Sequence, residues 1–119
     1  MTSNRGANDP NSKSKQLAEK IASKISNVKI IDATDLMIYP CEGNVSAKNS
    51  NICGIAGAKL EDENKNPSGQ HRCWTSLHHN DDELWQISKE LLQSDCVIFF
   101  GSVRWGQMNS IYQKLIERL

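Results

Sequence analysis

An uninterrupted apolar run at residues 96–100 is followed at once by Gly101 and Ser102, and this feature constrains the fold of the 119-residue chain most. A strand that is apolar at every position must be covered on both faces, as parallel strands are in sheets flanked by helices. The carboxyl ends of such strands open onto the crevice where α/β proteins bind ligands. We therefore expect a buried parallel strand at residues 96–100, with a ligand-binding loop directly after it.

Helical segments alternate with strand-like segments along the rest of the chain. Helices are expected to begin at Asn11 or Ser12, at an Asn80 cap supported by Glu83, and at about Asn109, with a further strand at residues 28–33. The expected buried positions of the two later helices are Leu84, Trp85, Ile87, Leu91 and Leu92, and then Ile111, Tyr112, Leu115, Ile116 and Leu119. This alternation predicts a parallel sheet with right-handed crossovers.

Residues 42–80 form an irregular excursion within what we expect to be a single domain spanning residues 1–119. The excursion is rich in Asn, Gly and Ser and has no sustained periodicity. A segment of this length without regular structure is unusual in a small domain and indicates either a functional insertion or partial disorder.

The charge balance excludes several classes of partner. Lys and Arg together number 14, as do Asp and Glu, so the net charge is zero. Proteins that bind nucleic acid or a membrane surface normally carry a basic excess. The sequence also has no apolar run long enough for a membrane span and no apolar signal segment. We therefore expect a cytoplasmic protein with neither a nucleic-acid nor a membrane partner.

The cysteines are expected to be free thiols. Disulfides are rare in the cytosol, and Cys96 lies in the expected buried strand. The other cysteines and all histidines lie in or beside the excursion, at Cys41, Cys53, Cys73, His71, His78 and His79. These residue types could hold zinc or an iron–sulfur cluster, but their spacing matches no compact ligand motif. A metal site is the less favoured alternative, and we assign no metal ligand.

Two segments could bind a ligand. The loop at residues 102–108 contains Trp105, which could form a wall for a planar ring, and Gly106, which allows close backbone approach. The alternative is an ordinary turn with a surface tryptophan. Near the N-terminus, hydroxyls and a guanidinium precede a helix and could cradle an anion, unless they are only a polar tail with routine capping.

Together these segments resemble the NAD(P)H-dependent FMN reductase family of the flavodoxin-like superfamily. The family's phosphate loop is matched by Ser3, Arg5, Ser12 and Ser14, its second-strand segment by Asp35, Leu36, Pro40 and Cys41, its third-strand block by residues 101–109, and its next helix by Lys114, Ile116, Glu117 and Arg118. Val103 stands where the family has a proline. The first, fourth and fifth strands of the family are not matched, so the resemblance implies an incomplete domain.

The resemblance implies a three-layer α/β/α fold with a parallel sheet, and an oxidoreductase that passes a hydride from NAD(P)H through flavin N5 to a small-molecule electron acceptor. It implies that FMN phosphate is held by Ser3, Arg5, Ser12 and Ser14, and that the flavin ring contacts Ser102, Val103, Arg104, Trp105, Gly106, Gln107 and Met108. No catalytic side chain is assigned. The alternative is a truncated, non-catalytic fragment that acts as an interaction module or inactive paralogue. Homo-oligomerisation is left open.

Overall fold

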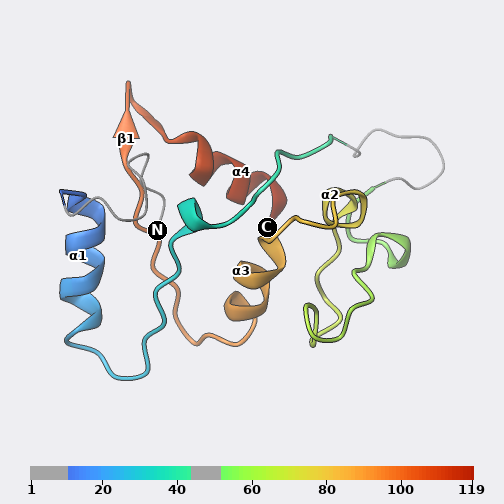
Figure 1. Cartoon of the computed structure of the whole chain (residues 1–119), viewed down its shortest axis with the longest axis horizontal. Coiled ribbons are helices and arrows are strands. Elements are labelled where there is room, and N and C mark those ends of the chain that lie inside the picture. Colours follow the sequence, from blue (N-terminus) through green and yellow to red (C-terminus); the bar gives the residue numbers. More distant parts are fainter. Residues whose placement is uncertain (1–10, 44–51) are drawn as a thin grey trace. The chain divides into compact units, whose positions relative to one another are not determined.

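A computed structural model describes residues 11–43 and 52–119, and these fall into two compact units (Figure 1). Unit 1 consists of the described part of Met1–Leu36 together with Ile98–Gln113. Unit 2 consists of the described part of Met37–Val97 together with Lys114–Leu119. Each unit is described by itself below.

Short helices dominate the described residues. The α-helices are α1 (Lys13–Ala22), α2 (Trp74–His78), α3 (Leu84–Leu91) and α4 (Ser110–Arg118), and the 3₁₀ turns are η1 (Ala33–Asp35) and η3 (Ala56–Ala58). Strands β1 (Val103–Arg104) and β2 (Gln107–Met108) form an antiparallel pair. Within residues 11–43 and 52–119, this pair is the only sheet, beside an isolated antiparallel bridge between Lys59 and Arg72.

The predicted flavodoxin-like parallel sheet is therefore wrong for the described residues. Residues 28–32 form no strand, and η1 follows them, with the Asp32 carboxylate accepting a hydrogen bond from the Thr34 amide at 3.1 Å. Residues 96–100 likewise form no strand, and Ile98 is 55% exposed. An apolar run favours a buried strand only where neighbouring strands accept its backbone hydrogen bonds, and no parallel pairing occurs in the described part of the chain.

Two of the three predicted helix starts are confirmed. The Ser12 hydroxyl caps α1 by accepting a hydrogen bond from the Lys15 amide at 3.4 Å. The Asn109 side chain accepts one from the Tyr112 amide at 3.0 Å at the start of α4. Each bond satisfies an amide that has no partner within its helix. The Asn80 start is wrong, because α3 begins later, at Leu84.

The core of unit 2 combines apolar residues from several segments. Its buried apolar residues are Ile38, Ala58, Cys73, Leu84, Ile87 and Leu115. Leu84 and Ile87 confirm the central part of the predicted α3 stripe, whereas Leu92 is exposed. On α4 the predicted Leu115 is buried, but Ile116 and Leu119 are exposed, and Arg118 is buried instead.

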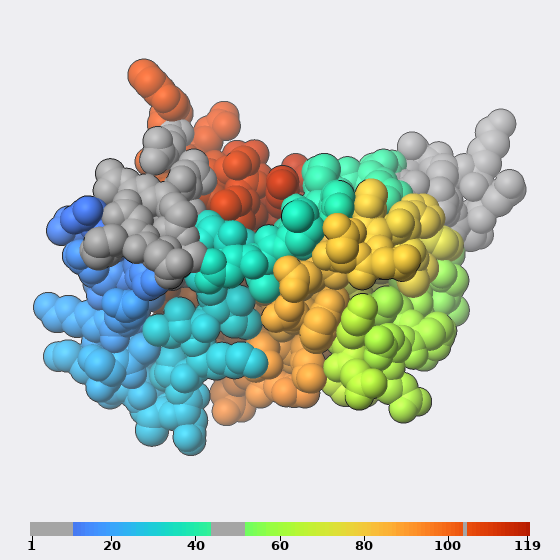
Figure 2. All heavy atoms as spheres, in the orientation of Figure 1, coloured from blue at the N-terminus to red at the C-terminus, as the bar shows by residue number. Residues whose placement is uncertain are grey.

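Residues 52–80 of the irregular excursion pack closely against α3. The Lys89 ammonium donates a hydrogen bond to the Asn64 carbonyl at 3.3 Å, and the Lys65 ammonium lies over the Trp85 ring at 5.8 Å from its centre. In the space-filling view the green and yellow excursion forms one continuous surface with orange α3 (Figure 2). The described part of the excursion therefore lacks long elements but belongs to the body of unit 2.

Candidate functional site

A buried ion pair lies at the centre of unit 2. Arg118, in the last turn of α4, donates from Nη1 to Oδ1 of Asp82 at 2.7 Å and from Nη2 to Oδ2 at 2.8 Å. Both side chains are completely buried. The two parallel hydrogen bonds match the planar guanidinium to the carboxylate, which is the geometry that gives Arg–Asp pairs their specificity.

A chain of hydroxyl and imidazole groups extends from this pair. The Ser76 hydroxyl donates to Asp82 Oδ2 at 2.8 Å and accepts a bond from Arg118 Nη2 at 2.9 Å. His71 then bridges two serines, with Nε2 at 2.9 Å from Ser76 Oγ and Nδ1 at 2.9 Å from Ser88 Oγ. All these side chains belong to unit 2 and lie in its interior.

Counting hydrogens assigns the tautomer of His71. Ser76 has one hydroxyl hydrogen, which the Asp82 carboxylate takes because an ionised carboxylate can only accept. His71 Nε2 must therefore carry the hydrogen that it donates to Ser76, and Nδ1 accepts from Ser88. Both ring nitrogens are satisfied in this neutral form, which the lowered pKa of His71 favours.

The pKa values of the network follow from burial and from the ion pair. Burial, reinforced by the positive charge of Arg118, lowers the pKa of His71. Burial alone would raise the pKa of Asp82, but hydrogen bonds from Arg118 and Ser76 outweigh it and lower that pKa. Burial alone would lower the pKa of Arg118, and its bonds to Asp82 and Cys73 instead raise it. Both members of the pair therefore remain ionised at neutral pH.

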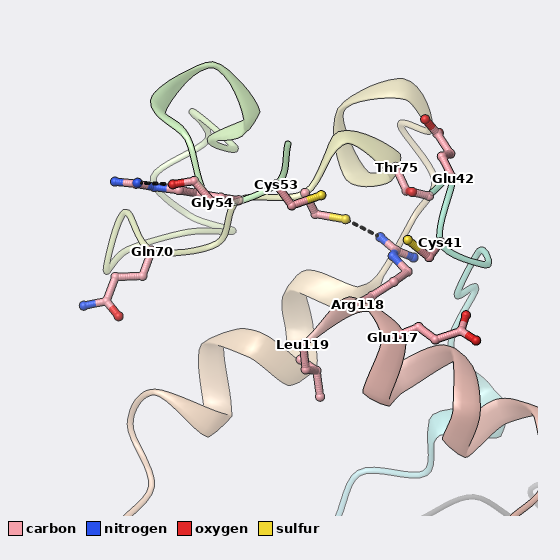
Figure 3. A pocket seen from close by; sticks show the side chains of 11 residues that line it. Cys41, Glu42, Cys53, Gly54, Gln70, Thr75, Glu117, Arg118 and Leu119 are labelled. Atoms are coloured by element: carbon pink, nitrogen blue, oxygen red, sulfur yellow. Dashed lines mark hydrogen bonds between the residues drawn. The ribbon is translucent and has the colours of Figure 1, made fainter. Parts of the chain in front are cut away.

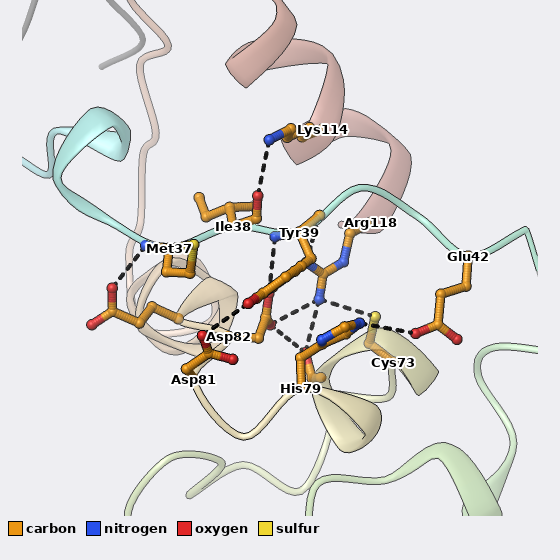
Figure 4. A network of polar contacts seen from close by, with 12 residues as sticks. Met37, Ile38, Tyr39, Glu42, Cys73, His79, Asp81, Asp82, Lys114 and Arg118 are labelled. Atoms are coloured by element: carbon orange, nitrogen blue, oxygen red, sulfur yellow. Dashed lines mark hydrogen bonds and ion pairs between the residues drawn. The ribbon is translucent and has the colours of Figure 1, made fainter.

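The acidic run before α3 holds the segment at residues 37–39, as Figure 4 shows. The Asp81 carboxylate accepts from the Tyr39 hydroxyl at 2.8 Å, and Asp82 accepts from the Tyr39 amide at 3.3 Å. The Glu83 carboxylate accepts from the Met37 amide at 2.8 Å. The sequence predicts that Glu83 supports a cap at Asn80, but no side chain caps α3. The three acids instead make long-range contacts to residues 37–39.

A pocket of about 560 Å³ lies beside this network in unit 2, and three of its lining residues are cysteines. Cys41, Cys53 and Cys73 are free thiols, of which Cys53 is exposed and Cys73 buried. Figure 3 shows Cys41, Cys53 and Arg118 gathered around the pocket. Within the described residues, no group of three His, Cys, Asp or Glu side chains is placed to hold a metal ion.

The two adjacent histidines interact with a lining residue of the pocket. Glu42 contacts His78 Nδ1 at 2.8 Å and His79 Nε2 at 3.6 Å. His79 also stacks on the Tyr39 ring, with 4.0 Å between ring centres. These rings therefore help to fix residues 39–42 against the end of α2.

The described FMN-binding candidates all lie in unit 1, and Ser3 and Arg5 lie outside the described residues. Ser12 caps α1, and Ser14 lies in its first turn. Ser102, Val103, Arg104, Trp105, Gly106, Gln107 and Met108 form the β1–β2 hairpin and its approach. Trp105 and Gly106 make the turn at φ 54° and 78°, and the indole is fully exposed. None of these residues lines the pocket of unit 2.

Sequence reasoning missed the whole buried network of unit 2. One signal was present, because Arg118 falls three residues after Leu115 and therefore lies on the buried face of its helix. A charge at such a position requires a buried partner of opposite sign. The sequence did not indicate which acid would supply it, since Asp81, Asp82 and Glu83 are consecutive.

Comparison of the chain with models of known protein families, with curated proteins and with solved structures found no match. No helix in the described parts of the chain combines the length and the apolar character needed to cross a membrane.

Proposed function

We propose that unit 1 binds FMN and that the protein is a cytoplasmic oxidoreductase, passing electrons from NAD(P)H through the flavin to a small-molecule acceptor. The observation that carries this proposal is the exposed Trp105 at the tip of the β1–β2 hairpin. The proposal does not include a parallel sheet. It depends on the chemistry of the hairpin and of the start of α1.

The hairpin presents an indole in a way that suits a planar ligand. Two-residue turns with both φ values positive are favoured in hairpins, but bulky side chains rarely occupy them. A tryptophan there accepts a conformational cost while leaving its apolar ring in water. Stacking a flavin ring on the indole would bury one face of each ring. Such a ligand explains why a tryptophan occupies this turn better than an ordinary turn does.

The start of α1 suits the phosphate of FMN. The first-turn amides and the helix dipole favour an anion, and Lys13 and Lys15 add positive charge beside Ser12 and Ser14. This helix belongs to the same compact unit as the hairpin. The phosphate end and the ring end of one ligand could thus be held by a single unit.

FMN supplies the redox chemistry when bound, since its ring accepts a hydride and passes on electrons. The chain's own residues would bind and orient it. The hydroxyls and amides at the start of α1 would hold the phosphate, and the hairpin would hold the ring. No side chain is assigned as an acid or base.

The test is FMN binding by the full chain, measured by calorimetry and by quenching of flavin fluorescence. Replacing Trp105 with Ser should weaken binding roughly fivefold to tenfold, because an aromatic pair contributes about 1 kcal/mol beyond buried area. Trp105→Phe should retain most of the affinity, and Trp85→Phe in unit 2 is the matched control. A chain that does not bind FMN, or a Trp105→Ser variant of unchanged affinity, would contradict the proposal.

A second candidate is an interaction module, and the exposed apolar side chains of unit 1 favour it. Ile98, Phe99 and Val103 are exposed by 55%, 43% and 63%. Large apolar patches on a surface are typical of protein interfaces. Sedimentation of the full chain, with Val103→Lys beside it, separates the two candidates. Self-association that this change abolishes, in a chain without FMN affinity, would favour the module.

A further inference from the structure

We propose that Cys53 and Cys73 form a reversible disulfide, which makes the pocket of unit 2 a thiol redox site. The two thiols line the same pocket and are free in the structure. This site lies outside the residues proposed to bind FMN, and the inference stands independently of that proposal.

Contacts on both sides of each cysteine hold the two residues opposite one another. Arg72, just before Cys73, donates from Nη1 to the Gly54 carbonyl at 2.6 Å. Trp74, just after Cys73, donates from Nε1 to the Ile52 carbonyl at 3.2 Å. The neighbours of one cysteine thus bind the neighbours of the other, and we call these two hydrogen bonds the clamp.

The clamp distinguishes Cys53 from the other thiols as the partner of Cys73. Cys41 also lines the pocket, but its sulfur accepts a hydrogen bond from the Gly43 amide at 3.3 Å, and the clamp does not include its neighbours. Cys96 is exposed and does not line this pocket. A disulfide requires close approach of two Cα atoms, and the clamp holds the backbone around Cys53 beside the backbone around Cys73.

The difference in exposure gives the two thiols different roles. Cys53 is exposed and can meet an oxidant, whereas Cys73 is buried and can only react within the protein. Cys73 Sγ also accepts a hydrogen bond from Arg118 Nη2 at 3.4 Å, so a positive charge faces the sulfur that must attack. Cys53 is therefore the first thiol to react, and Cys73 resolves the product.

The oxidant is a low-molecular-weight disulfide such as oxidised glutathione. The Cys53 thiolate, formed by loss of its proton to water, attacks one glutathione sulfur, making a mixed disulfide and releasing one glutathione thiolate that takes up a proton. The Cys73 thiol then loses its proton, attacks Cys53 Sγ as the thiolate, and releases the second glutathione as a thiolate that takes up a proton. One disulfide and two protein thiols thus become one protein disulfide and two glutathione thiols.

Tryptic mapping of the full chain after treatment with oxidised glutathione and alkylation tests the proposal. Cleavage at Lys29, Lys48, Lys59, Arg72, Lys89 and Arg104 places every cysteine on a peptide of its own. We expect one linkage, between the Cys53 and Cys73 peptides, which reduced glutathione reverses. Cys96 should carry only a glutathione adduct and serves as the internal control for an exposed thiol without a partner.

Variants separate the two roles. Cys73→Ser should leave a lasting glutathione adduct at Cys53, and Cys53→Ser, at an exposed position, should leave Cys73 unreacted. Replacing Arg72 with Met and Trp74 with Phe removes the clamp but keeps all thiols, and should slow resolution of the adduct about tenfold. A linkage through Cys41, a Cys53 adduct as lasting as that at Cys96, or an unchanged rate without the clamp would overturn the proposal.

Discussion

The guanidinium of Arg118 is completely buried and is paired with an equally buried carboxylate. Its two terminal nitrogens bind Asp82, and Nη1 also donates to the Tyr39 carbonyl at 2.8 Å. Its Nε, in contrast, is buried without a hydrogen-bond partner in the described part of the chain. A buried pair of this kind contributes less through its own attraction than through the cost of leaving either member alone.

Replacing Arg118 with Met should therefore destabilise unit 2 strongly. The change leaves the Asp82 carboxylate buried without its counter-ion, and we expect a loss of about 3–5 kcal/mol in urea denaturation. The double variant Arg118→Met with Asp82→Leu should recover much of that loss, because it removes both charges. As the control, Lys59→Met, which breaks an exposed pair with Glu61, should cost no more than about 1 kcal/mol. Equal losses for Arg118→Met and Lys59→Met would contradict this account.

His71 should make stability depend on pH. Its pKa is lower in the folded state than its ordinary value of 6.5, so the unfolded chain binds a proton first as the pH falls. Stability is then lost as the pH drops below 6.5, and the loss continues until the folded-state pKa is reached. The same sign holds for Asp82, whose lowered pKa places its own loss below the ordinary value of 3.8.

The measurement is the free energy of unfolding as a function of pH for the native chain and for His71→Gln. Glutamine can donate to Ser76 and accept from Ser88 without titrating. The variant should therefore lose the slope that begins near pH 6.5 and keep the loss below 3.8. An unchanged slope near 6.5 would show that another group causes it.

At the scale of single elements, capping residues could be predicted from sequence, and tertiary partners could not. Ser12 and Asn109 lie at predicted helix starts, and in the structure each accepts a hydrogen bond from a nearby amide of its helix. Asn80 follows the same rule but fails, since the acids after it bind Met37 and Tyr39 rather than the helix. Such contacts join residues more than forty positions apart and leave no local pattern.

The apolar run at residues 96–100 shows the same limit for strands. Its composition is that of a covered strand, yet Ile98 and Phe99 are exposed. Periodicity reports which side chains prefer burial, but a strand also needs a neighbour for its backbone. For the same reason the buried face of α4 could be predicted at Leu115, whereas the ion pair at Arg118 could not.

The cap of α1 provides a test on one helix. Replacing Ser12 with Ala removes the acceptor for the Lys15 amide and should destabilise the helix by about 1 kcal/mol. Ser14 is the second residue of α1. Ser14→Ala should be neutral or slightly stabilising, because alanine is the better helix former. Thermal unfolding followed by circular dichroism, without ligand, compares the two. A larger loss for Ser14→Ala would show that Ser12 is not the effective cap.

At the scale of the whole chain, the irregular excursion contains much of what holds unit 2 together. The Asn66 side chain donates to the Leu60 carbonyl at 2.8 Å and accepts from the His71 amide at 3.0 Å. The Cys73 amide donates to the Ala58 carbonyl at 2.9 Å. A segment with only one short helix and one 3₁₀ turn in its described part can therefore be well anchored, because side chains supply hydrogen bonds that a β-sheet would otherwise provide.

Hydrogen exchange should reveal this arrangement. The amides of His71 and Cys73 are bonded to partners within unit 2 and should exchange slowly. Those of residues 97–99, which are exposed and lie outside helices and strands, should exchange fast. Mass spectrometry of peptic fragments measures both regions in one experiment. Slow exchange at residues 97–99 together with fast exchange at 71–73 would contradict the proposed anchoring of the excursion.

The bonds that Arg118 makes have a consequence for the order of folding. They join it to Asp82, 36 positions away, and to Tyr39, 79 positions away, so a long loop must close before either bond can form. Contacts with such separation are costly to form early. We expect them to be absent from the transition state, so that weakening the pair speeds unfolding and leaves the folding rate almost unchanged. The ion pair would then set the unfolding rate of unit 2, and so the lifetime of its folded state, rather than the folding rate.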